Sequence, residues 1–203
     1  LQTVLGNVDD NVETALEKLL ELISIPSISS EPAAKPDIER AAHWLERELA
    51  SLGMEAKVVA TKGHPVVLGH SLDAPGSDSP RLLFYGHYDV QPIGDPDQWR
   101  HPPFEPRVVE EEGVRRFYGR GASDSKSQLW TFIEALRAWK AVNGAFPAQI
   151  VVMLEGEEEC GSPSLADFIE AYQRDLACDV AFICDSEMWS PTQPAITTQL
   201  KGL

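Results

Sequence analysis

The sequence lacks the features that mark membrane and secreted proteins. No run of eighteen apolar residues occurs in its 203 positions, and the N-terminus has no basic segment followed by an apolar stretch. We therefore predict neither a membrane span nor a signal peptide, and we expect a cytoplasmic location. Low-complexity tracts and internal repeats are also missing, and a hydrophobic content of 43% is enough for a packed core. These properties favour a single domain.

Positive charge is scarce. Lys and Arg number 17 against 32 Asp and Glu, which gives a formal net charge of -15. Nucleic acids and anionic membranes are bound through clustered basic residues, so this balance argues against both as partners. An acidic balance suits a protein that collects divalent cations, but most surplus carboxylates simply form a solvated surface.

Cysteine is sparse as well. Cys160, Cys178 and Cys184 are odd in number and have no C-x-x-C spacing, which disfavours a disulfide framework or a cysteine-rich zinc site. We expect buried free thiols. A phosphate loop is not expected either, because Gly119 and Gly121 lack the lysine and the further glycines of nucleotide-binding motifs.

Helices and strands are predicted to alternate along the chain. Apolar residues at helical spacing predict helices over residues 9–23, 36–52, 126–142 and 163–174, the last capped by Ser162. Short apolar runs predict strands over residues 56–60, 66–69, 81–85, 150–154 and 180–184. This order predicts an α/β fold with a mixed, largely parallel sheet and helices on both of its faces.

Residues of metal-binding type follow three of the predicted strands. His87 and Asp89 follow residues 81–85, and Asp185 follows residues 180–184. Four glutamates lie within residues 155–159, directly after another strand, and Asp124 lies in a glycine-rich turn before the third helix. Ligand sites of open α/β sheets form outside the carboxyl ends of the strands, so we expect these side chains to share one crevice.

Carboxylates combined with an imidazole suit zinc or a similar divalent ion. Three carboxylates against two dications are close to neutral, whereas three unpaired buried carboxylates would not stay ionised. Metal binding therefore explains this cluster better than ordinary surface acids beside an incidental histidine.

Three segments carry a family resemblance. They are LFYGHYDVQP at residues 83–92, YGRGASDSK at 118–126 and EGEEECGS at 155–162. In this order they resemble the carnosinase-type metallodipeptidases, which are related to aminoacylases, succinyl-diaminopimelate desuccinylases and glutamate carboxypeptidases. The resemblance runs along nearly the whole chain and implies the fold of a zinc-peptidase catalytic domain.

The resemblance implies two divalent metal ions, zinc with manganese or cobalt as alternatives. The metal ligands that it implies are His87, Asp124, Glu159 and Asp185. The resemblance implies that Asp124 bridges the two ions, that His87 and Asp185 complete one site, and that Glu159 contributes to the other. Asp89 is implied to hold the imidazole of His87, and Glu158 to be the general base that acts on a bridging water.

One position departs from the family pattern, and the glutamate run leaves alternatives open. Ser127 stands where the family pattern has a glycine, and Glu155 or Glu157 remain alternatives to the working glutamates. Family members also hold the bridging aspartate through a cis peptide, so we expect a cis bond between Asp124 and Ser125.

Three functions are consistent with these residues. The resemblance favours hydrolysis of the peptide bond in dipeptides or other small peptides. An N-acyl amino acid deacylase or carboxypeptidase of the same family is the enzymatic alternative. A non-catalytic module that binds metal or a partner is the alternative of another class.

The family pattern also suggests how the chain is organised. Members continue into a lid or dimerisation domain and then return with a last histidine ligand. We interpret residues 1–198 as the N-terminal portion of the catalytic domain and residues 199–203 as the start of the lid. We therefore expect this fragment to bind two ions unequally without catalysis, and the full-length protein to be a homodimer through the lid.

Overall fold

The computed structural model describes residues 1–71, 79–190 and 192–198, which contain four α-helices and seven β-strands. The helices are α1 (Gln2–Ile23), α2 (Lys35–Ser51), α3 (Ser127–Asn143) and α4 (Leu165–Ala171). The strands are β1 (Met54–Val59), β2 (Val66–Ser71), β3 (Arg81–His87), β4 (Arg107–Glu111), β5 (Val114–Tyr118), β6 (Gln149–Glu155) and β7 (Val180–Ile183).

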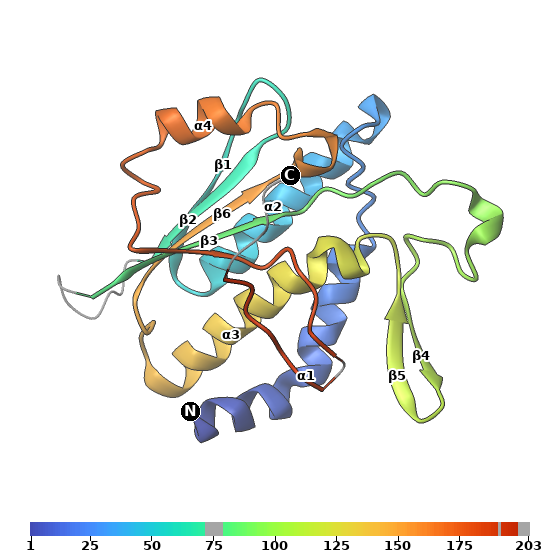
Figure 1. Cartoon of the computed structure of the whole chain (residues 1–203), viewed down its shortest axis with the longest axis horizontal. Helices are drawn as coiled ribbons and strands as arrows, with labels where there is room; N and C mark the ends of the chain where they lie inside the picture. The colour runs from blue at the N-terminus through green and yellow to red at the C-terminus, as the bar shows by residue number, and fades with distance from the viewer. Residues whose placement is uncertain (72–78, 191, 199–203) are drawn as a thin grey trace.

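Five of these strands form one mixed sheet in the order β1-β2-β6-β3-β7 (Figure 1). Strands β6 and β7 both run parallel to β3, while β2 is antiparallel to β6 and β1 is antiparallel to β2. Four strands therefore point the same way and β2 alone opposes them. The mixed, largely parallel sheet predicted from the sequence is confirmed.

Helices cover both faces of this sheet (Figure 1). On one face, α1, α2 and α3 bury residues such as Leu22, Ile38 and Ile133 against Val152 of β6. On the other face, Phe168 of α4 packs in a smaller cluster that includes the β6 residues Val151 and Met153. Because side chains alternate across a strand, the apolar run of β6 supplies both cores.

The structure differs from the sequence prediction at three places. Helix α1 begins at Gln2 rather than near residue 9. Ser162 does not cap α4, because its φ of 49° places it in a left-handed turn and its hydroxyl donates to Glu155 Oε1 at 3.0 Å. The hairpin β4–β5 was not predicted, since both of its strands are polar and largely exposed. Its signal was the Glu112-Gly113 pair, where both residues have positive φ.

The cysteines and the chain ends complete the description. All three cysteines are free, as expected, but the prediction that they are buried is wrong: Cys160 and Cys178 are exposed and Cys184 is half-buried, because they lie in short connections rather than in the core. The predicted start of a lid, residues 199–203, lies outside the described residues. In the described part of the chain, no helix has the length and apolar character needed to cross a bilayer.

Candidate metal centre

The sheet brings the ends of three adjacent strands together. His87 is the last residue of β3 and pairs with Glu155, the last residue of β6. Strand β7 lies on the other side of β3, and Asp185 follows its end by two residues. Because these strands are parallel, their carboxyl ends form one edge, where α/β folds place their ligands.

Asp124 reaches this edge from the turn before α3. Gly121 in this turn has a φ of 80°, and a Cβ atom there would lie 2.4 Å from Val90 Cγ1, so the position needs glycine. The peptide between Asp124 and Ser125 is cis, as expected. Ser127, which stands in place of a family glycine, is accommodated because its hydroxyl donates to the carbonyl of Ala122.

Three side chains converge on one point. His87 Nε2 lies 3.2 Å from Asp124 Oδ1 and 3.6 Å from Asp185 Oδ2. One ligand atom from each of these residues lies within 4.8 Å of the other two. The imidazole is fully buried, whereas the carboxylate of Asp124 is 66% exposed. The ring therefore lies on the protein side of the cluster, and this carboxylate lies on the solvent side. An imidazole nitrogen with two carboxylate oxygens is a donor set that fits zinc.

Asp89 fixes the imidazole from behind. His87 Nδ1 lies 3.1 Å from the carbonyl of Asp89 and 3.4 Å from its carboxylate Oδ1, and both side chains are fully buried. A proton on Nδ1 satisfies these acceptors and leaves the lone pair of Nε2 directed toward Asp124 and Asp185. This is the arrangement in which histidine binds a metal.

The electrostatics of this edge favour a cation. Burial lowers the pKa of His87, but the hydrogen bond with Asp89 and the negative charges of Asp89, Asp185 and Glu158 together raise it to about 9. The surrounding carboxylates thus stabilise positive charge at the imidazole.

The carboxylate of Asp89 also organises the loop after β6. It accepts hydrogen bonds from the backbone N–H of Glu158 at 3.2 Å and from that of Glu159 at 3.1 Å. These bonds offset the cost of burying its charge. One side chain therefore joins the histidine to both glutamates that the sequence assigned to the site.

The four neighbouring glutamates differ in their hydrogen-bond partners. The carboxylate of Glu155 accepts hydrogen bonds from the hydroxyls of Tyr85 and Ser162. That of Glu157, a residue only 4% exposed, accepts from the backbone N–H of His64 at 2.8 Å and of Ser164 at 3.1 Å. Both carboxylates are occupied in supporting the fold.

Glu158 and Glu159 are half-exposed and lie within the field of the cluster. Burial raises the pKa of Glu158 and the positive charge of His87 opposes this shift. Burial also raises the pKa of Glu159, a hydrogen bond from Gln91 lowers it, and the charge of Asp124 raises it again. The charges of the cluster therefore act on both carboxylates, but neither belongs to the group formed by His87, Asp124 and Asp185, whose ligand atoms converge.

Gln91 is a contact that the sequence prediction missed. Its side chain donates to Glu159, 68 positions away along the chain. The available signal was its place in the loop after β3, two residues beyond Asp89.

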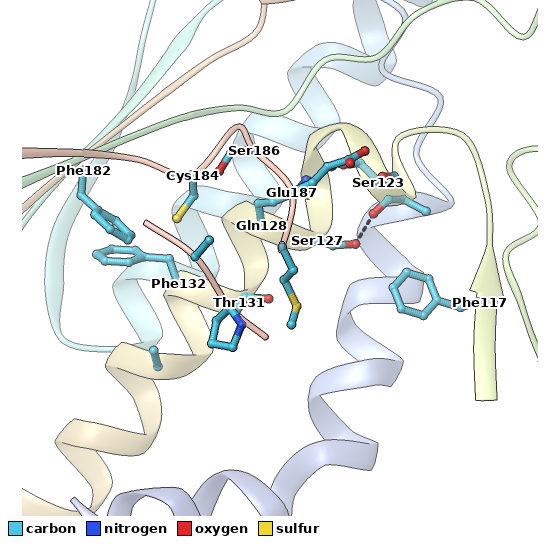
Figure 2. A pocket seen from close by; sticks show the side chains of 15 residues that line it. Phe117, Ser123, Ser127, Gln128, Thr131, Phe132, Phe182, Cys184, Ser186 and Glu187 are labelled. Carbon is cyan, nitrogen blue, oxygen red and sulfur yellow. Dashed lines mark hydrogen bonds between the residues drawn. The ribbon is translucent and has the colours of Figure 1, made fainter. Parts of the chain in front are cut away.

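A cavity of about 780 Å³ lies beside the cluster, between α3 and the segment after β7 (Figure 2). Its lining includes Ser123 and Cys184, the chain neighbours of Asp124 and Asp185, but not the three clustered residues themselves. Phe132 of α3 and Phe182 of β7 face each other at one end, with ring centroids 6.2 Å apart. This mostly apolar space adjoins the polar site and is separate from it.

The chain is similar in sequence to known peptidases. The sequence profile of "Peptidase family M20/M25/M40" matches residues 83–199, more than half of the chain. A cysteinylglycine-S-conjugate dipeptidase of Corynebacterium striatum is 35% identical over 97% of this chain and 42% of its own length. The human Beta-Ala-His dipeptidase is 30% identical over 100% of this chain and 42% of its own length.

Solved structures give the same result. The di-peptidase Dug1p of Saccharomyces cerevisiae matches with a TM-score of 0.82 at 27% identity, over 92% of this chain and 41% of that one. Human carnosine dipeptidase 1 matches with a TM-score of 0.81 at 29% identity, over 93% and 41%. The fold is therefore that of the catalytic domain in these peptidases, and the chain spans less than half the length of the relatives it matches.

Proposed function

The chain belongs to peptidase family M20/M25/M40, and from this premise we propose that it carries part of the active site of a metal-dependent dipeptidase. The observation that carries the proposal is the convergence of His87 Nε2 with the carboxylates of Asp124 and Asp185 at the strand ends. The names of the relatives, Cys-Gly and Beta-Ala-His dipeptidases, support dipeptides as the substrate class.

We propose that two divalent ions, both zinc, bind at this edge. His87, Asp124 and Asp185 would hold one ion, and Asp124 with Glu159 would contribute to the other. When bound, such ions would supply Lewis acidity that lowers the pKa of a water toward about 7 and polarises the scissile carbonyl. A homodimer and a cytoplasmic location are further parts of this proposal.

The proposed roles of the remaining residues concern protons and orientation. Glu158 would act as the general base, taking a proton from the attacking water and giving it to the leaving amine. Burial raises the pKa of Glu158, which makes its carboxylate a better proton acceptor near neutral pH. Asp89 would keep the proton of His87 on Nδ1, so that Nε2 remains a ligand.

A second candidate is hydrolysis of N-acyl amino acids or removal of a C-terminal residue. A succinyl-diaminopimelate desuccinylase of Burkholderia ambifaria is 31% identical over 67% of this chain. The structure of an M20 family metallo-carboxypeptidase from Sulfolobus solfataricus matches with a TM-score of 0.74 at 32% identity. The sequence match to a desuccinylase and the structural match to a carboxypeptidase support this second class of amide bond beside the first.

The test is a substrate screen of the native gene product loaded with zinc. We expect hydrolysis of Cys-Gly and of Beta-Ala-His, and loss of this activity in Asp185→Ala, which removes a proposed ligand. Hydrolysis of N-acyl amino acids alone would favour the second candidate. A zinc-loaded protein that hydrolyses neither class would overturn the enzymatic proposal.

A further inference from the structure

The side chain of Gln91 holds Glu159 at two points. Gln91 Nε2 donates to Glu159 Oε2 at 2.8 Å and to the backbone carbonyl of Glu159 at 3.0 Å. Because both acceptors are oxygens, the carboxamide has to present its nitrogen, and both of its N–H donors are used. The two bonds tie the carboxylate of Glu159 to its own backbone and so restrict its side-chain rotamer.

The backbone that follows Gln91 is fixed by contacts with Arg120 and Trp99. Arg120 Nη2 donates to the carbonyl of Pro92 at 2.8 Å, and the guanidinium of Arg120 lies 5.1 Å from the ring centroid of Trp99. Trp99 Nε1 donates to the carbonyl of Ile93 at 2.8 Å. The carbonyls of Pro92 and Ile93 are thus fixed by one distant side chain and by one from the same loop, so the backbone that carries the carboxamide is anchored.

A neutral donor is suited to orienting a carboxylate that binds a cation. Lysine or arginine at position 91 would orient Glu159 equally well, but its positive charge would compete with a divalent ion. The amide engages Oε2 and leaves the second oxygen of Glu159 available. It also holds the carboxylate against repulsion from the like charge of Asp124, which acts on Glu159.

We propose that Gln91 is a positioning residue that sets Glu159 in the orientation from which it binds a divalent ion shared with Asp124. This inference rests on the proposed function. It adds a residue that touches neither the metal nor the substrate and acts only through Glu159.

The experiment is a cobalt(II) titration of the 203-residue chain, followed by visible absorption and calorimetry. Gln91→Leu keeps a similar volume and removes both donors. Gln98→Leu is the matched control, since Gln98 lies on the same loop and is exposed. We expect Gln91→Leu to weaken the second, weaker cobalt ion by about 10- to 100-fold, the usual effect of losing a group that orients a ligand. The first ion and the melting temperature should not change.

The outcomes separate this inference from the proposed function. Two cobalt ions with unchanged affinities in Gln91→Leu would overturn the positioning role and leave the proposed function standing. Parallel weakening of both ions would show a general structural role and would overturn it too. An unsubstituted chain that binds no cobalt would overturn the proposed function and this inference together.

Discussion

Asp89 is the side chain through which the separate parts of the site contact one another. It lies against the imidazole of His87 and accepts the backbone N–H groups of Glu158 and Glu159. Each oxygen of its carboxylate accepts one of these two N–H groups. An asparagine of similar size has only one oxygen and could accept only one of them. The chemistry of the cluster therefore depends on a residue that is not expected to touch the metal.

Asp89→Asn should weaken zinc binding by about 10- to 100-fold. The new amide removes the negative charge beside His87 and turns an N–H₂ group toward one of the two backbone N–H donors. Competition with a chromogenic zinc chelator measures the change. Asp10→Asn, an exposed aspartate of α1, is the control and should bind as the unsubstituted chain does. A zinc affinity in Asp89→Asn equal to that of the unsubstituted chain would show that Asp89 does not support the metal site.

Glu158 and Glu157 should respond differently to the same substitution. In the native gene product, Glu158→Gln should lower kcat by about 10²- to 10⁴-fold through loss of the general base, with zinc content and stability unchanged. Glu157→Gln should instead lower the free energy of unfolding by about 1–3 kcal/mol, because one of two buried backbone N–H groups loses its acceptor. Dipeptide assays and urea denaturation of both variants give the comparison. The reverse pattern would show that Glu157 is the working residue.

Among individual residues, the sequence predicted more of the candidate metal ligands than of the residues that hold their neighbours in place. His87 and Asp124 lie within recognisable segments, Asp185 follows a predicted strand, and the structure brings the three residues together. The roles of Ser162 and Gln91 depend on partners that only the fold brings near, in the case of Gln91 a residue 68 positions away. A local sequence pattern does not predict a contact between residues that are far apart along the chain.

Helices and strands with a strong apolar pattern were predicted well, because burial of one face fixes both their type and their position. Strand β6 is buried along nearly its whole length, and its prediction required only the apolar run. The hairpin β4–β5 has no such face, since Val108 and Val114 are exposed. Its pairing depends on the turn at Glu112-Gly113 rather than on burial, so the apolar pattern could not show it.

The turn that carries Asp124 is joined to helix α1 by Lys126. This side chain is fully buried, and its Nζ donates to the carbonyls of Leu22 at 3.0 Å and Ile25 at 2.8 Å. The carbonyls at the end of a helix carry partial negative charge, which offsets part of the cost of burying an ammonium group. Burial nevertheless lowers the pKa of Lys126 to about 7.

Lys126→Met should lower the free energy of unfolding by about 1–3 kcal/mol or more, because two buried carbonyls lose their donor while the apolar stem keeps its volume. Urea denaturation measures this difference. Lys62→Met is the matched control, since Lys62 is 85% exposed and pairs only with Asp167 at the surface, and it should unfold as the unsubstituted chain does. Equal midpoints for both variants would contradict the structural role of Lys126.

At the scale of the whole molecule, apolar side chains are exposed on strand β7 and on the segment that follows it. In the described residues, β7 pairs only with β3, and Val180 and Ile183 on it are 54% and 60% exposed. Trp189 and Ile196 in the following segment are 78% and 80% exposed. Surfaces of this kind mark sites of further contact.

Zinc should bind this chain unequally and without dipeptide turnover. Within the described residues, one proposed site has an imidazole and two carboxylates, whereas the second proposed site would have only the carboxylates of Asp124 and Glu159. A zinc ion with too few protein ligands binds weakly. Calorimetric titration with a parallel Cys-Gly assay tests this expectation. Two equally tight ions, or turnover comparable to that of the native gene product, would show that the ligands have been assigned incorrectly.

The central claim is that His87, Asp124 and Asp185 together hold a divalent ion. The most direct measurement is a crystal structure of the chain grown with zinc, with anomalous data collected on both sides of the zinc absorption edge. We predict a strong anomalous peak about 2.0–2.2 Å from His87 Nε2 and from one carboxylate oxygen each of Asp124 and Asp185. A fully occupied zinc ion bound elsewhere, or no peak within reach of His87 at saturating zinc, would contradict the claim.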